Sequence, residues 1–191
     1  EAKKGAIDGI VGASKDDAPD LIYPEVPLAT VRMAFFVKKG SAWKYNGVKS
    51  LEAIKLGVIS GYACDSEVDD YIEKNKVADK AVQAIGDDNA LALNIKKLAV
   101  GRIDATIEDE VVFWKKAKEL GLEKDFVEAG APPVGDDDDV YIAFSPAKKT
   151  SAQLAEILTK GIKDLRDSGE FKKVMEKYGI KDIPKDKPKE K

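Results

Sequence analysis

Short apolar runs alternate with amphipathic stretches through most of this chain, and that alternation limits its possible folds more than any other feature. The apolar runs are typical of strands and lie at 6–11, 31–37, 57–60, 81–85, 103–107 and 140–144. Between two of them, Leu91, Ile95 and Leu98 recur at helical spacing. Strands that alternate with helices favour a parallel or mixed sheet covered by helices, so the sequence predicts an α/β fold.

The helices expected between these strands have recognisable starts and stops. Ser66, three residues before Asp69, resembles a capping box, and Asp87 or Asp88 is expected to cap a helix that ends at Gly101. Further helices are predicted over 50–54 and 108–120, and two more close the chain on apolar residues at helical spacing. The Lys-, Asp- and Pro-rich end, 181–191, is expected to be a disordered tail.

Composition excludes several classes of chemistry. The 191 residues contain no histidine and one cysteine, so Ser-His or Cys-His nucleophile pairs and an internal disulfide are ruled out. Because 32 basic and 35 acidic residues are interspersed, no basic stripe for nucleic acid is expected. Asp136–Asp139 form a run of acids without the spacing of a calcium loop, so a solvated loop is the preferred interpretation. The sequence predicts no metal and no cofactor.

Neither a signal peptide nor a membrane span is expected in the chain. No apolar run approaches the roughly 20 residues that cross a bilayer. The chain opens at Glu1 rather than at Met, and we expect it to be mature, trimmed or incomplete at this end.

Four segments resemble, in this order, the solute-binding proteins of polar amino-acid ABC transporters. This group is extracellular solute-binding family 3, which has the type 2 periplasmic-binding-protein fold. Each segment matches the family pattern only loosely, and the signal lies in the order and spacing of all four. The segments are AIDGIVGASKDDAPDLIYPEVPL (6–28), GVKSLEAIKLGVISGY (47–62), ALNIKKLAVGRIDATIED (92–109) and AEILTKGIKDLRDSGEFKKVMEKYGI (155–180).

The resemblance implies two α/β lobes with mixed sheets covered by helices. Residues 1–34 and 145–180 would form the first lobe, and residues 35–144 would form the second. The family's first lobe has a further strand-helix-strand unit, so this lobe is expected to be incomplete.

The resemblance also implies ligand-binding positions after the strands of the first lobe. Gly12, Ala13 and Ser14 end the first apolar run, and ligands of open α/β sheets lie beyond the carboxyl ends of strands. Ser14 and nearby carbonyls would accept hydrogen bonds from a ligand ammonium group. A polar turn residue that caps its own backbone is an equal alternative for Ser14.

In the second lobe, Gly61, Tyr62 and Ala63 stand between a predicted strand and a helix, where free backbone N–H groups bind carboxylates. The alternative is an ordinary loop with Tyr62 in the core. Asp109 follows another strand, and the resemblance implies that it holds a ligand amino group. Its alternative is helix stabilisation by an acid in the first turn, which is also the interpretation of Glu108 and Glu110.

Pro19 departs from the family pattern. The family has an arginine here that grips an α-carboxylate, whereas this chain has Asp16, Asp17, Ala18 and Pro19. Either Arg32 substitutes for it, or the ligand is cationic or neutral. The alternative for Arg32 is an edge position with its head in solvent.

These features together predict a receptor rather than an enzyme. A small polar solute, amino-acid-like or a related amine or organic acid, would bind in a cleft between the lobes, for delivery to a membrane permease or a sensor. The protein would be exported to the periplasm. The alternatives are a dehydratase-like enzyme on the same scaffold, with Glu108 or Asp109 as its acid or base, and a non-transport protein whose cleft has decayed.

Overall fold

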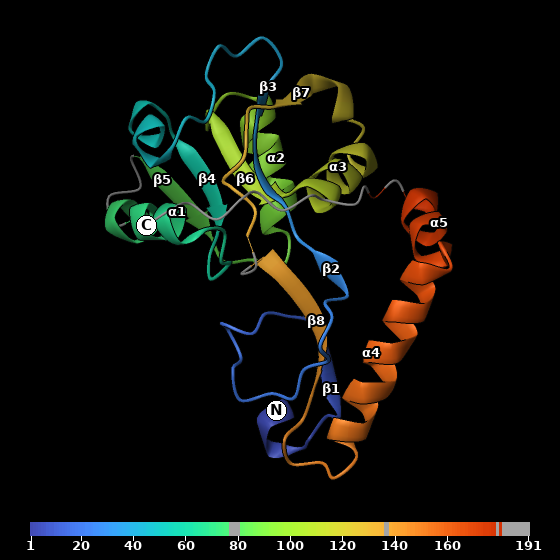
Figure 1. Cartoon of the computed structure of the whole chain (residues 1–191). Coiled ribbons are helices and arrows are strands. Elements are labelled where there is room, and N and C mark those ends of the chain that lie inside the picture. The colour runs from blue at the N-terminus through green and yellow to red at the C-terminus, as the bar shows by residue number, and fades with distance from the viewer. Residues whose placement is uncertain (77–80, 136–137, 179, 181–191) are drawn as a thin grey trace. The chain divides into compact units, whose positions relative to one another are not determined.

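A computed structural model describes residues 1–76, 81–135, 138–178 and 180 (Figure 1). The predicted tail at 181–191 and two members of the acidic run, Asp136 and Asp137, lie outside the described residues. The chain divides into two compact units. Unit 1 combines Glu1–Val31 with Pro133–Lys191, and unit 2 is Arg32–Pro132.

Unit 2 contains a five-stranded mixed sheet in the order β5-β4-β6-β3-β7. Strand β4 is parallel to both β5 and β6, whereas β3 is antiparallel to β6 and β7. The strands are β3 (Met33–Lys38), β4 (Leu56–Ile59), β5 (Val82–Ile85), β6 (Ala105–Asp109) and β7 (Phe126–Glu128). The helices are η2 (Val48–Ala53), α1 (Ser66–Asn75), α2 (Ala90–Ala99), α3 (Glu110–Glu119) and η4 (Glu123–Asp125).

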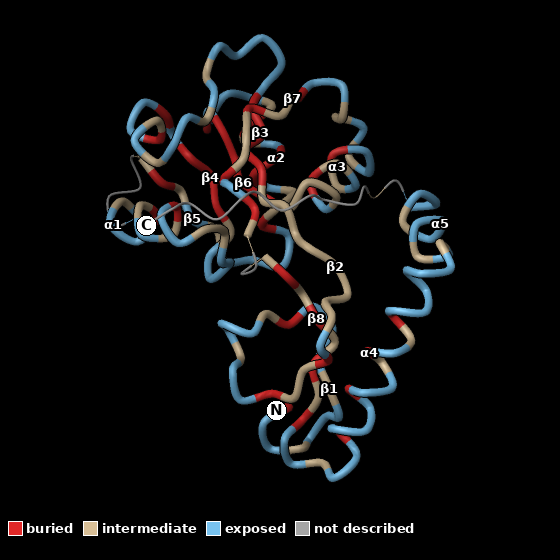
Figure 2. Tube along the Cα trace, in the orientation of Figure 1, coloured by how far each residue is buried: buried red, intermediate tan, exposed pale blue. Residues whose placement is uncertain are grey.

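Strand β3 carries apolar side chains on both of its faces, so both faces of the sheet must be covered. Phe35 and Val37 pack into one apolar cluster, which includes residues of η2 and α1. Ala34 and Phe36 point the other way and pack into a second cluster with residues of α2 and α3. All four side chains are fully buried, as expected for a near-continuous apolar strand in the middle of a covered sheet (Figure 2).

Unit 1 contains a smaller, antiparallel sheet in the order β1-β8-β2. A small core forms around Ala13, Leu21 and Ala143. The long helix α4 contacts β8 and is followed by the shorter α5. The elements are η1 (Ala2–Lys4), β1 (Gly9–Ala13), β2 (Ala29–Thr30), β8 (Asp139–Phe144), α4 (Ser151–Asp167) and α5 (Glu170–Lys177).

Several elements differ from the sequence-based expectations. The chain switches units near residues 32 and 133, whereas the expected lobes met at 34 and 144, because β8 pairs with β1 and β2. The expected helix over 108–120 begins at Glu110, and Glu108 and Asp109 belong to β6. The helix after Gly61 is capped by Asp65, not by Ser66, which is its first residue.

Gly57 of β4 allows α2 to lie close to the sheet. A Cβ atom there would overlap the Cδ1 of Ile103 and lie 3.0 Å from the Oδ1 of Asn94. Both neighbours are buried, so Gly57→Ala should destabilise the protein by about 1–3 kcal/mol in urea unfolding. Gly161→Ala in α4 is the matched control, since no atom lies within 4 Å of its added Cβ, and it should be neutral or stabilising. Equal effects of the two substitutions would contradict this packing.

Candidate functional site

The turn after β1 uses Ser14 to hold its own backbone. The Oγ of Ser14 accepts a hydrogen bond from the Asp16 N–H at 3.1 Å, and its carbonyl accepts one from the Tyr23 hydroxyl at 2.7 Å. Gly12, with φ of 82°, marks the irregularity that ends the regular pairing of β1. The side chain of Ala13 is buried in the core of unit 1. The structure therefore shows the turn role of Ser14, and a ligand role for these three residues stays a prediction.

The loop between β4 and α1 presents Gly61, Tyr62 and Ala63 to solvent. Gly61 has φ of 81°, a left-handed conformation that favours glycine. The Tyr62 side chain is 58% exposed, so the alternative that placed it in the core is wrong. This loop can offer both backbone groups and an aromatic hydroxyl to a solute.

Carboxylates of the chain itself occupy the start of α1. The Oδ1 of Asp65 accepts hydrogen bonds from the N–H groups of Glu67 and Val68, at 3.0 and 3.2 Å. Both oxygens of Asp69 lie 3.1 Å from the Cys64 nitrogen and accept its N–H. A ligand carboxylate at this helix start would have to compete with these two acids, so the expected anion site there is disfavoured.

A hollow of about 250 Å³ adjoins the same loop. Its charged lining consists of Asp69, Glu73 and Lys76, and the Lys76 ammonium pairs with Glu73 at 2.6 Å. Among the described residues of this lining, Lys76 therefore balances one of the two acids, and Asp69 already accepts the Cys64 N–H. The remaining lining residues are Val58, Ile59, Ser60, Gly61, Tyr62, Ala63, Ile72 and Ala84.

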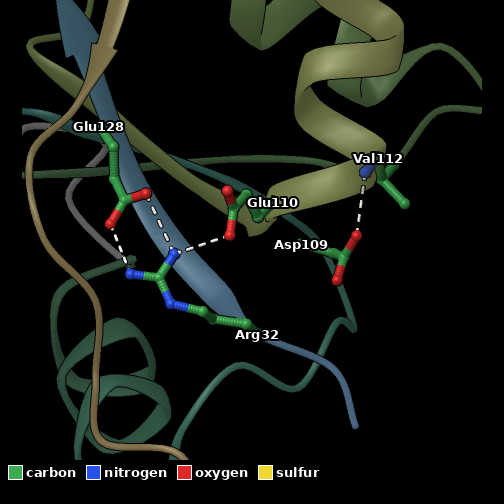
Figure 3. Close-up of polar contacts among 5 residues, drawn as sticks. All are labelled: Arg32, Asp109, Glu110, Val112 and Glu128. Carbon is green, nitrogen blue, oxygen red and sulfur yellow. Dashed lines mark hydrogen bonds and ion pairs between the residues drawn. The ribbon is translucent and has the colours of Figure 1, made fainter. Parts of the chain in front are cut away.

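Asp109 caps α3 at the end of β6. Its Oδ1 accepts the N–H of Val112 at 2.9 Å, which is the helix-stabilising role that the sequence offered as the alternative (Figure 3). Its side chain is half-buried. Because β4 and β6 run parallel, the Gly61 loop and Asp109 follow these strands at the same edge of the sheet.

Arg32 lies in a cluster of ion pairs rather than with its head in solvent, and its role as a ligand contact stays a prediction. Its guanidinium binds the Glu128 carboxylate with two hydrogen bonds, at 2.6 and 3.0 Å, and Glu110 with a third at 2.9 Å (Figure 3). Hydrogen bonding to Glu128 is the main reason why the pKa of Arg32 is raised. The side chain is 25% exposed, so its head is not in open solvent, and a ligand carboxylate would have to compete with Glu110 and Glu128.

Glu108, which the sequence places beside Asp109, is a buried acid with a strongly raised pKa. Its side chain is 2% exposed, and its Oε1 accepts the N–H of Asp109 at 2.9 Å. Burial raises the pKa of Glu108 to about 7, while the hydrogen bond opposes this shift. The sequence analysis interpreted Glu108 as a residue in the first turn of a helix. Glu108 lies in β6 instead, and this position in the sheet explains its burial.

Neither a metal site nor a membrane span is found in the described part of the chain. Within it, no group of three or more His, Cys, Asp or Glu residues could hold a metal ion. No described helix has the length and apolar character needed to cross a membrane.

This chain resembles known proteins in its structure rather than in its sequence. No family model and no curated protein matches the sequence. A histidine kinase sensor domain with similarity to periplasmic binding proteins superposes with a TM-score of 0.70 at 19% identity, over 95% of this chain and 74% of its own. An ancestral arginine-binding protein bound to arginine superposes with a TM-score of 0.67 at 20% identity. The match covers 93% of this chain and 74% of the arginine-binding protein.

A third neighbour is an amino acid ABC transporter substrate-binding protein from Streptococcus pneumoniae, bound to L-arginine. It gives a TM-score of 0.62 at 23% identity, and the match covers 93% of this chain and 70% of the neighbour. The match spans both units of the chain and leaves part of each neighbour without a counterpart. This chain therefore has the α/β fold of the periplasmic binding proteins, as its four sequence segments predict.

Proposed function

We propose that this chain binds a small polar solute carrying an amino or other cationic group. The observation that carries the proposal is the edge of the unit 2 sheet, where the Gly61 loop and Asp109 follow two parallel strands. Solutes of open α/β sheets bind at such edges. The half-buried Asp109 carboxylate at this edge can supply the negative charge that an ammonium group requires.

The ion pairs of Arg32 make a solute with an ordinary α-carboxylate less suitable. A free guanidinium would favour an ordinary α-carboxylate, but Glu128 and Glu110 already bind this one. With Pro19 at the position of the family's arginine, the chain is better suited to cationic or neutral solutes. Three solved neighbours support an amine-bearing ligand, since two are described as bound to arginine and one to glutamine.

The biological setting that we propose is capture of the solute outside the cytoplasm and its delivery to a membrane partner. Amino acid ABC transporters account for several of the neighbours, and a sensor kinase accounts for another. A permease and a sensor are therefore the two partner classes. A receptor needs no catalytic group, and the buried Glu108 is poorly placed to contact a substrate.

A thermal-shift panel tests the proposal. The full chain is screened with arginine, lysine, glutamine, spermidine, glutathione and succinate, and the amine-bearing compounds should raise the melting temperature. A solute at 100 times its Kd stabilises the folded state by about 2.7 kcal/mol. Succinate, which has no amine, should give the smallest shift.

Variants of Asp109 separate ligand contact from helix capping. Asn caps a helix about as well as Asp, so Asp109→Asn should fold normally yet weaken binding of a cationic solute at least tenfold. Asp164→Asn on α4 is the control and should bind as the wild type does, and Ser14→Ala tests the other predicted contact. A panel without any shift would contradict the receptor proposal, and conversion of a bound compound to product would favour the enzyme instead.

A further inference from the structure

The buried carboxyl of Glu108 lies directly beside Asp109, the predicted solute contact at the carboxyl end of β6. Its side chain is 2% exposed, and its Oε1 accepts the Asp109 N–H at 2.9 Å. The Asp109 side chain is half-buried and accepts the Val112 N–H (Figure 3). A group that can hold a proton is therefore bonded to the backbone of the residue that is proposed to contact the solute.

The surroundings of Glu108 screen a charge poorly. Its cross-strand partner on β3 is the fully buried Ala34, and β4 on the other side of β6 carries no charged residue. The helices over the face of Ala34 contribute apolar side chains, among them Leu91 of α2 and Phe113 of α3. Charges interact more strongly through such apolar surroundings than through water.

Two titratable groups act on each other through Glu108. The negative charge of Asp109 adds to burial in raising the pKa of Glu108. Burial is the main reason why the pKa of the Cys64 thiol is also raised, and the charges of Asp69 and Glu108 raise it further. The thiol therefore stays neutral near pH 7, and Asp109 is the charged group of this pair.

Other charged groups on the surrounding elements are paired, exposed or farther away. Glu110 at the start of α3 binds Arg32. The acids at 87–88 precede α2 and are exposed. Both α2 and α3 begin at the carboxyl edge of the sheet, and their lysines lie in the second half of each helix: Lys96, Lys97, Lys115, Lys116 and Lys118. Asp109 is therefore the charge through which a bound cation would reach Glu108.

A cation at Asp109 would change the proton affinity of Glu108. The charge of Asp109 opposes ionisation of Glu108, and a cationic group that neutralises this charge removes the opposition. Because linkage is reciprocal, ionisation of Glu108 must in turn strengthen the binding of the cation. A decrease of about 1 in the pKa of Glu108 on binding would raise the affinity up to about tenfold between acid and alkaline pH.

We propose, resting on the proposed function, that binding of a cationic solute at Asp109 releases the proton that the buried Glu108 carboxyl holds in the free protein. The receptor would then hold its solute more tightly above neutral pH than in acid.

A titration without solute tests the coupling of the two carboxyls. In a ¹⁵N-labelled chain, the amide of residue 109 reports the ionisation of Glu108, because it donates to the Glu108 Oε1. The midpoint should lie near pH 7 in the wild type and roughly 0.3 pH unit or more lower in Asp109→Asn. Glu119→Gln, which removes an acid in the last turn of α3, should leave the midpoint unchanged. A midpoint that Asp109→Asn does not lower would overturn the proposal.

Calorimetry with agmatine and cadaverine tests the release itself. Both compounds lack a carboxyl group, and their cationic groups titrate at about pH 10 or above, as those of Lys and Arg do. Their dissociation constants should fall about three- to tenfold from pH 5 to pH 8 with the wild type, and stay nearly constant with Glu108→Gln. Wild-type binding that does not change with pH, or an equal pH dependence in Glu108→Gln, would overturn this inference alone. No binding of either amine at any pH would overturn it together with the proposed cationic solute.

Discussion

Phe113→Ala is expected to lower the free energy of unfolding by about 3–5 kcal/mol, which is the usual cost of removing a buried phenylalanine. Phe113 of α3 is fully buried and stacks on Phe36 of β3, with ring centroids 3.7 Å apart and planes 2° from parallel. The ring of Phe126 meets it edge-on at 5.7 Å. Truncation would leave a cavity between the helix layer and the sheet, and the loss should appear in urea unfolding followed by circular dichroism.

The neighbouring residue provides the control for that measurement. Val112 lies on the same helix and is 47% exposed, so Val112→Ala should cost less than about 1 kcal/mol. Similar losses for the two variants would show that α3 does not pack on β3 as the structure has it.

Glu108→Gln is expected to stabilise the protein by about 3 kcal/mol at pH 8 and by very little at pH 4. The pKa of this carboxyl is about 7 in the folded protein, against an ordinary value of 4.5. Between pH 4.5 and pH 7, Glu108 loses its proton in the unfolded chain but keeps it in the folded chain. The free energy of unfolding of the wild type therefore falls as pH rises through this range. Above pH 7 the folded state carries the full cost of a buried charge, at 1.36 kcal/mol per pKa unit.

Glutamine removes this cost because it does not ionise, and its oxygen can still accept the Asp109 N–H. Urea unfolding of both proteins at pH 4, 6 and 8 should show the stability difference growing with pH. Glu176→Gln, at an exposed position on α5, should show no such growth. A difference for Glu108→Gln that does not change with pH would mean that Glu108 is not buried as described.

The alternation of strands and helices could be predicted because local patterns determine it. The run of Val31–Val37 contains most of β3 (Met33–Lys38), and the helical spacing of Leu91, Ile95 and Leu98 belongs to α2. Strand β7 was missed because it has only three residues, too few for a pattern. The cap of α1 was misplaced by one residue, since Asp65 and Ser66 are both suitable caps.

The site was harder to predict because its contacts depend on the register of distant strands. Arg32 meets Glu128, 96 positions away, only because β3 pairs with β7. The burial of Glu108 depends on its cross-strand partner Ala34 and on the helices over that face of the sheet. Local sequence does show a glycine after β4 and an acid at the end of β6, whereas the ligand role predicted for Asp109 came from the family resemblance.

The most direct test of the central claim is to map a bound solute by amide chemical shifts in a ¹⁵N-labelled chain. Titration with the amine that gives the largest thermal shift should move the signals of Gly61, Tyr62, Ala63 and Asp109 in a saturable way. The Asp109→Asn protein should need at least ten times more solute for the same change. Shifts confined to other parts of the molecule, or no saturable shift with any amine of the panel, would contradict the claim that this edge of the sheet binds a solute.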